Sequence, residues 1–288
     1  TLHHKSFCCP VSGLLRGSVS MGSTLRRTDL LALSNLRNDG RKPHEIRRMR
    51  MQITDQGALV EMGLTTVLAT VRGPIECTRR SEEVADRCIL DVTVKTAPFA
   101  PSADRRVTNP QTDRRLVEQS HQLKRAMEAA ILLHLYPKSK IEIIVWVLAD
   151  DGGRLPAAIN ATTLALVHAG IPIKDLVCAC SAGIGSNGVT LVDLNKREES
   201  SNGGQPAVHL PCAMLPQRGT VVLAQCEARL SGLDELEKVL EAAMEGCRAV
   251  AQQLQAAIRE NAAALLTARS GQASHIINSF AVSTTATT

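Results

Sequence analysis

The chain has 288 residues, a formal net charge of +5 and 44% hydrophobic residues, so it can bury a sizeable core. Aromatic residues make up only 2%, which predicts an aliphatic core and excludes nucleic-acid binding that depends mainly on aromatic stacking. No apolar run approaches the roughly 20 residues of a transmembrane helix. The cysteines number nine, without a Cys-x-x-Cys pair, which argues against a zinc site or a disulfide framework and indicates a reducing compartment.

Basic residues are concentrated in the first part of the chain. Residues 1–125 contain 21 Lys and Arg against 13 Asp and Glu, whereas the remainder contains 12 against 15. A basic half suits a polyanionic partner, because phosphate contacts depend on positive charge. A solvated surface explains the same distribution equally well, so charge alone leaves both interpretations open.

The two ends differ in composition from the middle. Residues 1–27 contain no acid but include several serines and four basic residues, a composition compatible with a mitochondrial transit peptide. A clear amphipathic helix is missing there, so we favour a disordered extension over residues 1–36, with Met21 as an alternative start. The Ser-, Thr- and Ala-rich stretch 269–288 predicts a disordered tail. Between them we expect one domain, 37–268, in two halves of about 37–170 and 171–268.

The first half begins with strand-like segments. Alternating apolar residues, separated by Gly57, Gly63 and Gly73-Pro74, predict strands at 48–54, 58–62, 66–72 and 88–95. Residues 100–113 are rich in Pro, Asp, Asn and Arg, so we expect an exposed loop. A long helix is predicted over 116–135, because apolar residues recur there at every fourth position: Leu123, Met127, Ile131 and Leu135.

The remaining elements follow the same logic. The apolar run 141–148 predicts a central strand, and a helix is expected over 156–168 with Pro156 in its first turn. We then expect strands at 175–182, 189–194, 208–215 and 220–228, and a helix over 233–266. In the first of these strands Cys178 and Cys180 share a face, and we interpret them as small core residues. The order of elements indicates a mixed α/β or α+β fold in two similar halves.

Three features could carry chemistry. The glycine loop Ala149-Asp-Asp-Gly-Gly-Arg154 leads into a predicted helix, where free N–H groups and the helix dipole favour a phosphate group. It is neither a Rossmann fingerprint nor a Walker loop, and taken alone such a segment is more often an ordinary turn. Asp193, with Glu198 and Glu199 beyond it, lies at a strand end and could position a metal ion or donate a proton. Alone, Asp193 is more typical of a turn or cap.

The third feature is a set of arginine pairs. Arginine binds phosphate through two parallel hydrogen bonds, so pairs on loops suit contact along an RNA backbone. A solvated surface explains any single pair. The pairs are Arg79-Arg80, Arg105-Arg106 and, at the start of the long helix, Arg114-Arg115.

Six short segments stand in an order and at a spacing that together resemble the RNase PH family. The similarity covers about residues 37–260. Residues 175–183 are especially similar to the family members that form exosome rings. The resemblance implies an α+β fold, the βαβα arrangement of the ribosomal protein S5 domain 2-like type, in a ring of six such domains. The segments are Arg37-Asn-Asp-Gly-Arg41, Val71-Arg-Gly-Pro-Ile-Glu76, Asp113-Arg-Arg-Leu-Val-Glu118, Ala149-Asp-Asp-Gly-Gly153, Ala169-Gly-Ile-Pro-Ile173 and Val192-Asp-Leu-Asn195.

The resemblance also implies a chemistry for active members. Inorganic phosphate attacks the 3′-terminal phosphodiester of RNA and releases nucleoside diphosphates. An arginine at the start of the long helix, the glycine loop and an arginine after that loop hold the phosphate, and an aspartate assists. Carried over residue by residue, these positions are Arg115, Gly152, Gly153 and Asp193, with a second acid at Glu199, where active members usually have aspartate.

The position after the loop departs from the family pattern. Active members read Gly-Gly-Thr-Arg or similar, whereas this chain reads Gly152-Gly153-Arg154-Leu155, so Leu155 stands where the arginine is expected. Arg154 is one position away, which turns its side chain by about 100° around a helix. Losing a charge-assisted contact of this kind typically costs a few kcal/mol of transition-state stabilisation, on the order of a hundredfold in rate.

We therefore favour a subunit of a eukaryotic-type exosome core ring that supports 3′-to-5′ RNA degradation and ribosomal RNA processing without phosphorolytic activity of its own and without a cofactor. The resemblance implies these partners: single-stranded RNA, other RNase PH-like subunits in a six-membered ring, caps with S1 or KH domains and a separate hydrolytic nuclease, with no membrane. It implies the nucleus, nucleolus and cytoplasm as locations. The candidate RNA contacts are Arg79, Arg80, Arg105, Arg106 and Arg114.

Two alternatives stay open. The first is an active phosphate-dependent 3′-to-5′ exoribonuclease that uses inorganic phosphate and Mg²⁺, with Arg115, Arg154 and Asp193 carrying the chemistry. The second is a free-standing homohexameric RNase PH, against which the segment 175–183 argues.

Overall fold

The computed structural model describes residues 36–37, 39–77, 83–100, 113–185, 188–200, 208–226 and 232–285, with backbone alone for 200 and 270–285. The chain divides into two units, Thr1–Lys42 and Pro43–Thr288. In the described part of the first unit, the Gly40 N–H donates to the Arg37 carbonyl in a tight turn. Within the described residues, no helix combines the length and apolarity that a membrane span requires.

Five strands of the second unit form a mixed sheet with the order β1-β2-β3-β5-β4. Strands β1, β2, β3 and β5 pair antiparallel, and β4 pairs with β5 in parallel. Parallel neighbours need a crossover connection, which helix α2 (Arg114–Ala130) supplies between β4 and β5. The strands are β1 (Met49–Thr54), β2 (Gly57–Met62), β3 (Thr65–Glu76), β4 (Ile89–Thr96) and β5 (Ser139–Ala149).

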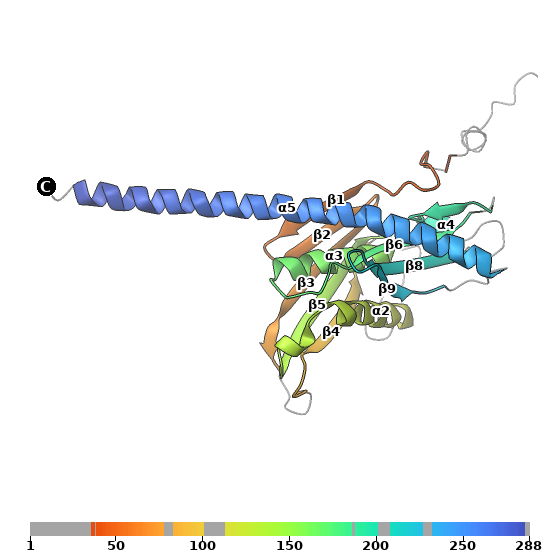
Figure 1. The fold of residues 1–288 in the computed structure, drawn as a ribbon, viewed down its shortest axis with the longest axis horizontal. Helices are drawn as coiled ribbons and strands as arrows, with labels where there is room; N and C mark the ends of the chain where they lie inside the picture. The colour runs from red at the N-terminus through yellow and green to blue at the C-terminus, as the bar shows by residue number, and fades with distance from the viewer. Residues whose placement is uncertain are drawn as a thin grey trace, which may run out of the picture. The chain divides into compact units, whose positions relative to one another are not determined.

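A second, four-stranded sheet has the order β7-β6-β8-β9, with all pairs antiparallel. Its strands are β6 (Cys178–Ile184), β7 (Thr190–Val192), β8 (Val208–Leu215) and β9 (Thr220–Ala224). Helix α3 (Arg154–His168) packs against β2 and β3 of the first sheet and against β6 of the second. Helix α5 (Leu233–Thr285) lies along β6 and β8, and the short helix α4 (Lys196–Ser200) follows β7 (Figure 1).

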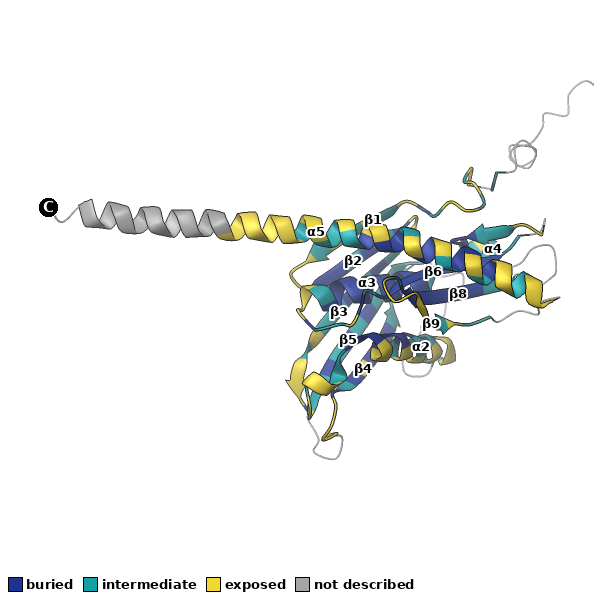
Figure 2. Ribbon diagram, viewed as in Figure 1, coloured by how far each residue is buried: buried dark blue, intermediate teal, exposed yellow. Residues whose placement is uncertain are grey.

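Helix α3 forms the centre of the core. Every residue from Leu155 to Leu166 is buried, so this helix is enclosed all round rather than on one face (Figure 2). Its fully buried Asn160 is satisfied by β6, because the side-chain amide donates to the Ala179 carbonyl (3.0 Å) and accepts from the Ala179 N–H (2.9 Å). The core around α3 is aliphatic, which confirms the expectation from composition.

The buried cysteines also follow the prediction. Cys178 and Cys180 are fully buried in β6, so their interpretation as small core residues is confirmed. Burial raises the pKa of the Cys178 thiol to about 12 and raises that of Cys180 as well. Neither thiol is therefore present as a reactive thiolate near neutral pH.

Several element boundaries differ from the predictions: β3 continues to Glu76, β6 begins at Cys178, and the ends of α2, β9 and α5 also differ. Helix α2 ends at Ala130, because Ile131 is extended and forms a β-bridge with Ile173. The predicted continuation of this helix to Leu135 is wrong. Leu135 is half exposed in a short 3₁₀ turn, Leu133–Leu135. Strand β9 ends at Ala224 rather than at 228. Helix α5 continues to Thr285 instead of ending near 266.

Candidate functional site

The glycine loop between β5 and α3 depends on two left-handed residues. Gly152 has φ 86° and Gly153, the N-cap of α3, has φ 65°, and both lie in the region that favours glycine. A Cβ atom at Gly152 would stand 2.5 Å from the Lys196 backbone nitrogen and 2.9 Å from the Leu194 carbonyl oxygen. The loop therefore lies directly against the chain that leads into α4.

The residue that ties the site together is Arg47, which the sequence did not single out. Its backbone N–H and Nε donate to Asp193 Oδ2 at 2.7 and 2.9 Å, and its Nη2 donates to Oδ1 at 2.7 Å. The same guanidinium donates to the carbonyls of Asp151 (3.0 Å) and Gly152 (3.2 Å). The hydroxyl of Thr65 also donates to the Gly152 carbonyl at 2.7 Å. Arg47 thus joins the approach to β1, the glycine loop and the segment after β7.

Burial and pairing act in opposite directions on Arg47. Burial alone would lower the pKa of this guanidinium, but the hydrogen bonds and the negative charge of Asp193 outweigh it, so the pKa is raised. Its side chain is 5% exposed and that of Asp193 is 0% exposed. The pair is a buried ion pair with its hydrogen bonds largely satisfied inside the protein.

Asp193 has a geometry that suits this structural contact. It has φ 56°, a left-handed value that aspartate tolerates better than most residues, and its N–H donates to the Ser181 carbonyl at 2.6 Å. Both carboxylate oxygens accept from Arg47. In the described part of the chain, no group of His, Cys, Asp and Glu has the arrangement of a metal site. In this structure Asp193 therefore holds the loop through Arg47.

Two further carboxylates accept hydrogen bonds from the loop. Glu199 Oε1 accepts from the Gly153 N–H at 2.7 Å and stands 3.4 Å from His209 Nε2. Asp150 Oδ1 accepts from the Gly152 N–H at 3.3 Å. The other oxygen of Asp150 pairs with Arg154 Nε at 3.4 Å and with Lys196 Nζ at 3.1 Å. The N–H groups of Gly152 and Gly153, and the cations Arg154 and Lys196, are therefore paired with acids of the chain itself.

The two residues after the loop point to different surroundings. Arg154 is 31% exposed at its side chain and directs its guanidinium to Asp150. Leu155 is only 7% exposed and belongs to the hydrophobic core around α3. The expected position of the phosphate arginine is thus filled by a core residue.

The arginine pairs are only partly placed. Arg114 and Arg115 are exposed in the first turn of α2, where Asp113 caps the helix by accepting from the Arg115 N–H at 3.1 Å. Among the described residues, no hydrogen bond or ion pair links Arg115 to the glycine loop. The structure therefore brings the loop, Asp193 and Glu199 together but does not join Arg115 to them. The other predicted RNA contacts lie outside the described residues: Arg79, Arg80, Arg105 and Arg106.

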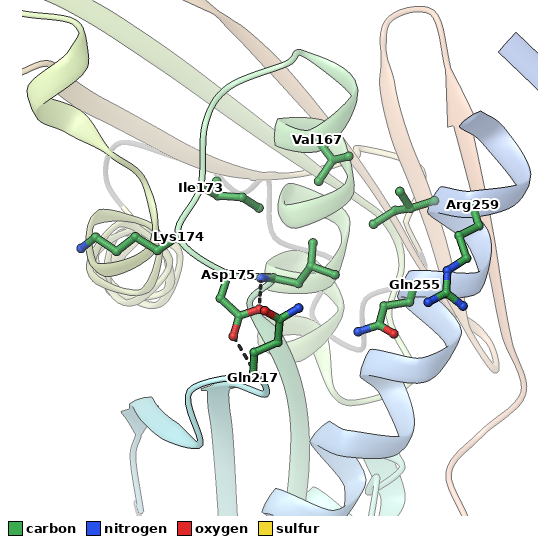
Figure 3. A pocket seen from close by; sticks show the side chains of 9 residues that line it. Val167, Ile173, Lys174, Asp175, Gln217, Gln255 and Arg259 are labelled. Atoms are coloured by element: carbon green, nitrogen blue, oxygen red, sulfur yellow. Dashed lines mark hydrogen bonds between the residues drawn. The ribbon is translucent and has the colours of Figure 1, made fainter. Parts of the chain in front are cut away.

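A separate groove of about 340 Å³ lies where the end of α3 approaches α5 (Figure 3). Val167, Ile173 and Ile258 give it apolar walls. The Asp175 carboxylate at its edge accepts from the backbone N–H groups of Leu176 (2.7 Å) and Gln217 (2.9 Å), as the dashed lines in Figure 3 show. The groove contains none of the predicted site residues, so it is not part of the glycine-loop site.

Comparison with known proteins identifies the family to which this fold belongs. The family model described as "3′ exoribonuclease family, domain 1" of RNase PH matches residues 45–172. The chain is 40% identical over 239 residues to exosome complex component RRP41 of mouse and of human, covering 81% of this chain and 94% of each relative. The chain therefore belongs to the RNase PH family.

Solved structures show the same fold. Rice Rrp46 matches with a TM-score of 0.65 and 25% identity, over 76% of this chain and 98% of that one. A chain of the Archaeoglobus fulgidus exosome matches with a TM-score of 0.64 and 22% identity, over 77% of this chain and 94% of that one. The predicted α+β fold of RNase PH type is thus confirmed.

Proposed function

We propose that this chain is a subunit of an exosome core ring, with a place like that of RRP41. Its 40% identity to exosome complex component RRP41 over 94% of that protein's length supports this assignment. The proposed partners are single-stranded RNA, other RNase PH-like subunits in a six-membered ring, S1/KH caps and a separate hydrolytic nuclease. The proposed locations are the nucleus, the nucleolus and the cytoplasm, and the proposed work is RNA degradation and ribosomal RNA processing.

We further propose that the subunit builds the ring and lines its RNA channel without catalysing phosphorolysis and without a cofactor. One observation carries this: Leu155, at the position expected for the second phosphate arginine, is buried in the core. The adjacent Arg154 pairs with Asp150, so its charge is already engaged. An incoming phosphate would meet no free guanidinium directly after the loop, and an oxyanion without such a donor loses a large electrostatic stabilisation.

The first prediction concerns the assembled ring. Incubated with a 3′-tailed RNA, a ring containing this chain is expected to release no nucleoside diphosphates above background, with or without inorganic phosphate. Chromatography of the nucleotide products measures this. Phosphate-dependent release of nucleoside diphosphates would instead support the alternative, an active exoribonuclease using inorganic phosphate and Mg²⁺. Retention of Arg115 and Asp193 in the sequence is what favours that alternative.

The second prediction concerns RNA binding by the loop arginines. Reversing the charge at four positions is expected to weaken binding of single-stranded RNA by the ring and to flatten its salt dependence, by up to about 0.7 in log–log slope per lost phosphate contact. The substitutions are Arg79→Glu, Arg80→Glu, Arg105→Glu and Arg106→Glu. Fluorescence anisotropy over a salt series measures both quantities.

A matched control separates channel contacts from bulk charge. Four exposed arginines elsewhere, changed to glutamate, alter the net charge of the chain by the same amount: Arg48, Arg50, Arg248 and Arg259. The RNA affinity of this control is expected to be closer to that of the unchanged ring than the affinity of the loop-arginine variant is. Equal weakening in the two variants would contradict a channel role for the loop arginines.

A further inference from the structure

The N-terminus of α3, at Gly153, is suited to binding an anion, and we call this site the anion corner. Gly153 is the N-cap of this 15-residue helix, whose unpaired N–H groups and dipole concentrate positive potential there. The corner already contains a negative group, because Glu199 Oε1 accepts from the Gly153 N–H at 2.7 Å. That distance is in the range of a charge-assisted hydrogen bond.

The position of Glu199 is fixed by its own helix. The Glu199 N–H donates to the Asn195 carbonyl at 2.9 Å, and Glu198 Oε2 accepts from the Asn195 N–H at 2.9 Å. The Lys196 N–H donates to the Asp151 carbonyl at 3.1 Å, so the start of α4 is bonded to the glycine loop itself. Glu199 is therefore held at the corner by backbone contacts and has a partly buried side chain, 25% exposed.

The charges around the corner also disfavour a second anion. Four carboxylates lie in or beside the loop, at Asp150, Asp151, Asp193 and Glu199, and His209 Nε2 stands 3.4 Å from Glu199 Oε1. Three permanent cations accompany them: Arg47, Arg154 and Lys196. Each of the three already contacts a carboxylate, Arg47 through Asp193 and the other two through Asp150. A phosphate dianion would have to displace Glu199 and break one of these pairs to gain a cationic partner.

We propose that Glu199 is a built-in occupant of the anion corner and that its carboxylate excludes inorganic phosphate from the glycine loop. The inference rests on the proposed non-catalytic function and adds a second cause beside Leu155. It also assigns a consequence to glutamate in place of the family's usual aspartate: the side chain is one methylene longer and reaches the Gly153 N–H.

The test compares the full chain with Glu199→Ala by thermal unfolding in inorganic phosphate and in chloride of equal ionic strength. Phosphate is expected to raise the Tm of Glu199→Ala by about 2–4 °C over chloride, because binding to the folded state alone stabilises it. The unchanged chain and the control Glu128→Ala, an exposed acid on α2, are expected to show no such gain. Broadening of the ³¹P NMR signal of phosphate gives a second readout of binding.

A second variant keeps the test decisive if Glu199→Ala folds poorly. Glu199→Gln retains the size and an acceptor oxygen but removes the charge, so a smaller gain in the same direction is expected. The proposal is overturned if neither variant responds, or if the unchanged chain responds as strongly as the variants. Phosphate binding to the unchanged chain without release of nucleoside diphosphates would overturn this inference alone, whereas such release by the ring would overturn the proposed function.

Discussion

Replacing Arg47 with methionine is expected to lower the free energy of unfolding by about 3–5 kcal/mol, because removing one partner of a buried ion pair leaves the other charge unpaired. Asp193 would lose the hydrogen bonds from Nε and Nη2 at a site with 0% exposure. The carbonyls of Asp151 and Gly152 would lose their guanidinium donors as well. Chemical denaturation monitored by circular dichroism measures the loss.

The neighbouring residue supplies the control. Arg48 is exposed, so Arg48→Met is expected to change the free energy of unfolding by no more than about 0.5 kcal/mol. The double variant Arg47→Met with Asp193→Asn removes both charges and keeps a residue that tolerates a left-handed backbone. It is expected to lose less stability than the sum of the two single changes. A loss below about 1 kcal/mol in Arg47→Met would contradict the role of Arg47 in holding Asp193 and the glycine loop.

Local patterns in the sequence predict most elements but not their pairing. Strand β5 follows from an apolar run that only Glu142 interrupts, and α3 begins two residues before its expected start at Pro156. The parallel pairing of β4 with β5 could not be read locally, since alternation of side chains is the same in either direction. The end of α2 was missed because Ile131 pairs with Ile173, a contact made only in the folded chain.

Local motifs likewise predict some residues of the candidate site but not others. The glycine loop and Asp193 were identified through local motifs, and the structure places them together with Glu199. Arg47 was missed because its partner Asp193 is 146 positions away, and a single arginine before a strand gives no local signal. The family pattern pointed to Leu155 as a missing charge, and burial adds that the position now belongs to the core.

The glycine loop is held in place by the core on one side and by Arg47 and the chain leading into α4 on the other. Helix α3 is buried from Leu155 to Leu166, so its first turn is fixed by packing in the core. The loop that precedes it is fixed from the other side by Arg47 and by the segment leading into α4. The glycine loop is therefore held on both sides by contacts within the protein.

Replacing Gly152 with alanine tests how tightly that assembly is closed. The change is expected to lower the free energy of unfolding by about 2–5 kcal/mol, combining a left-handed φ of 86° with a steric clash. The added Cβ would meet the Lys196 nitrogen at 2.5 Å and the Asn195 carbonyl carbon at 2.7 Å. Both are backbone atoms, so the start of α4 would have to move. Chemical denaturation again measures the loss.

Gly170 isolates the steric part of that cost. It has φ 70°, similar to Gly152, but a Cβ atom there would meet nothing within 4 Å. Gly170→Ala is therefore expected to cost only the backbone penalty, about 1–2 kcal/mol. Equal losses at the two glycines would show that the loop does not press against α4. If the loss at Gly152 is larger, the difference measures the contact between the loop and the chain that leads into α4.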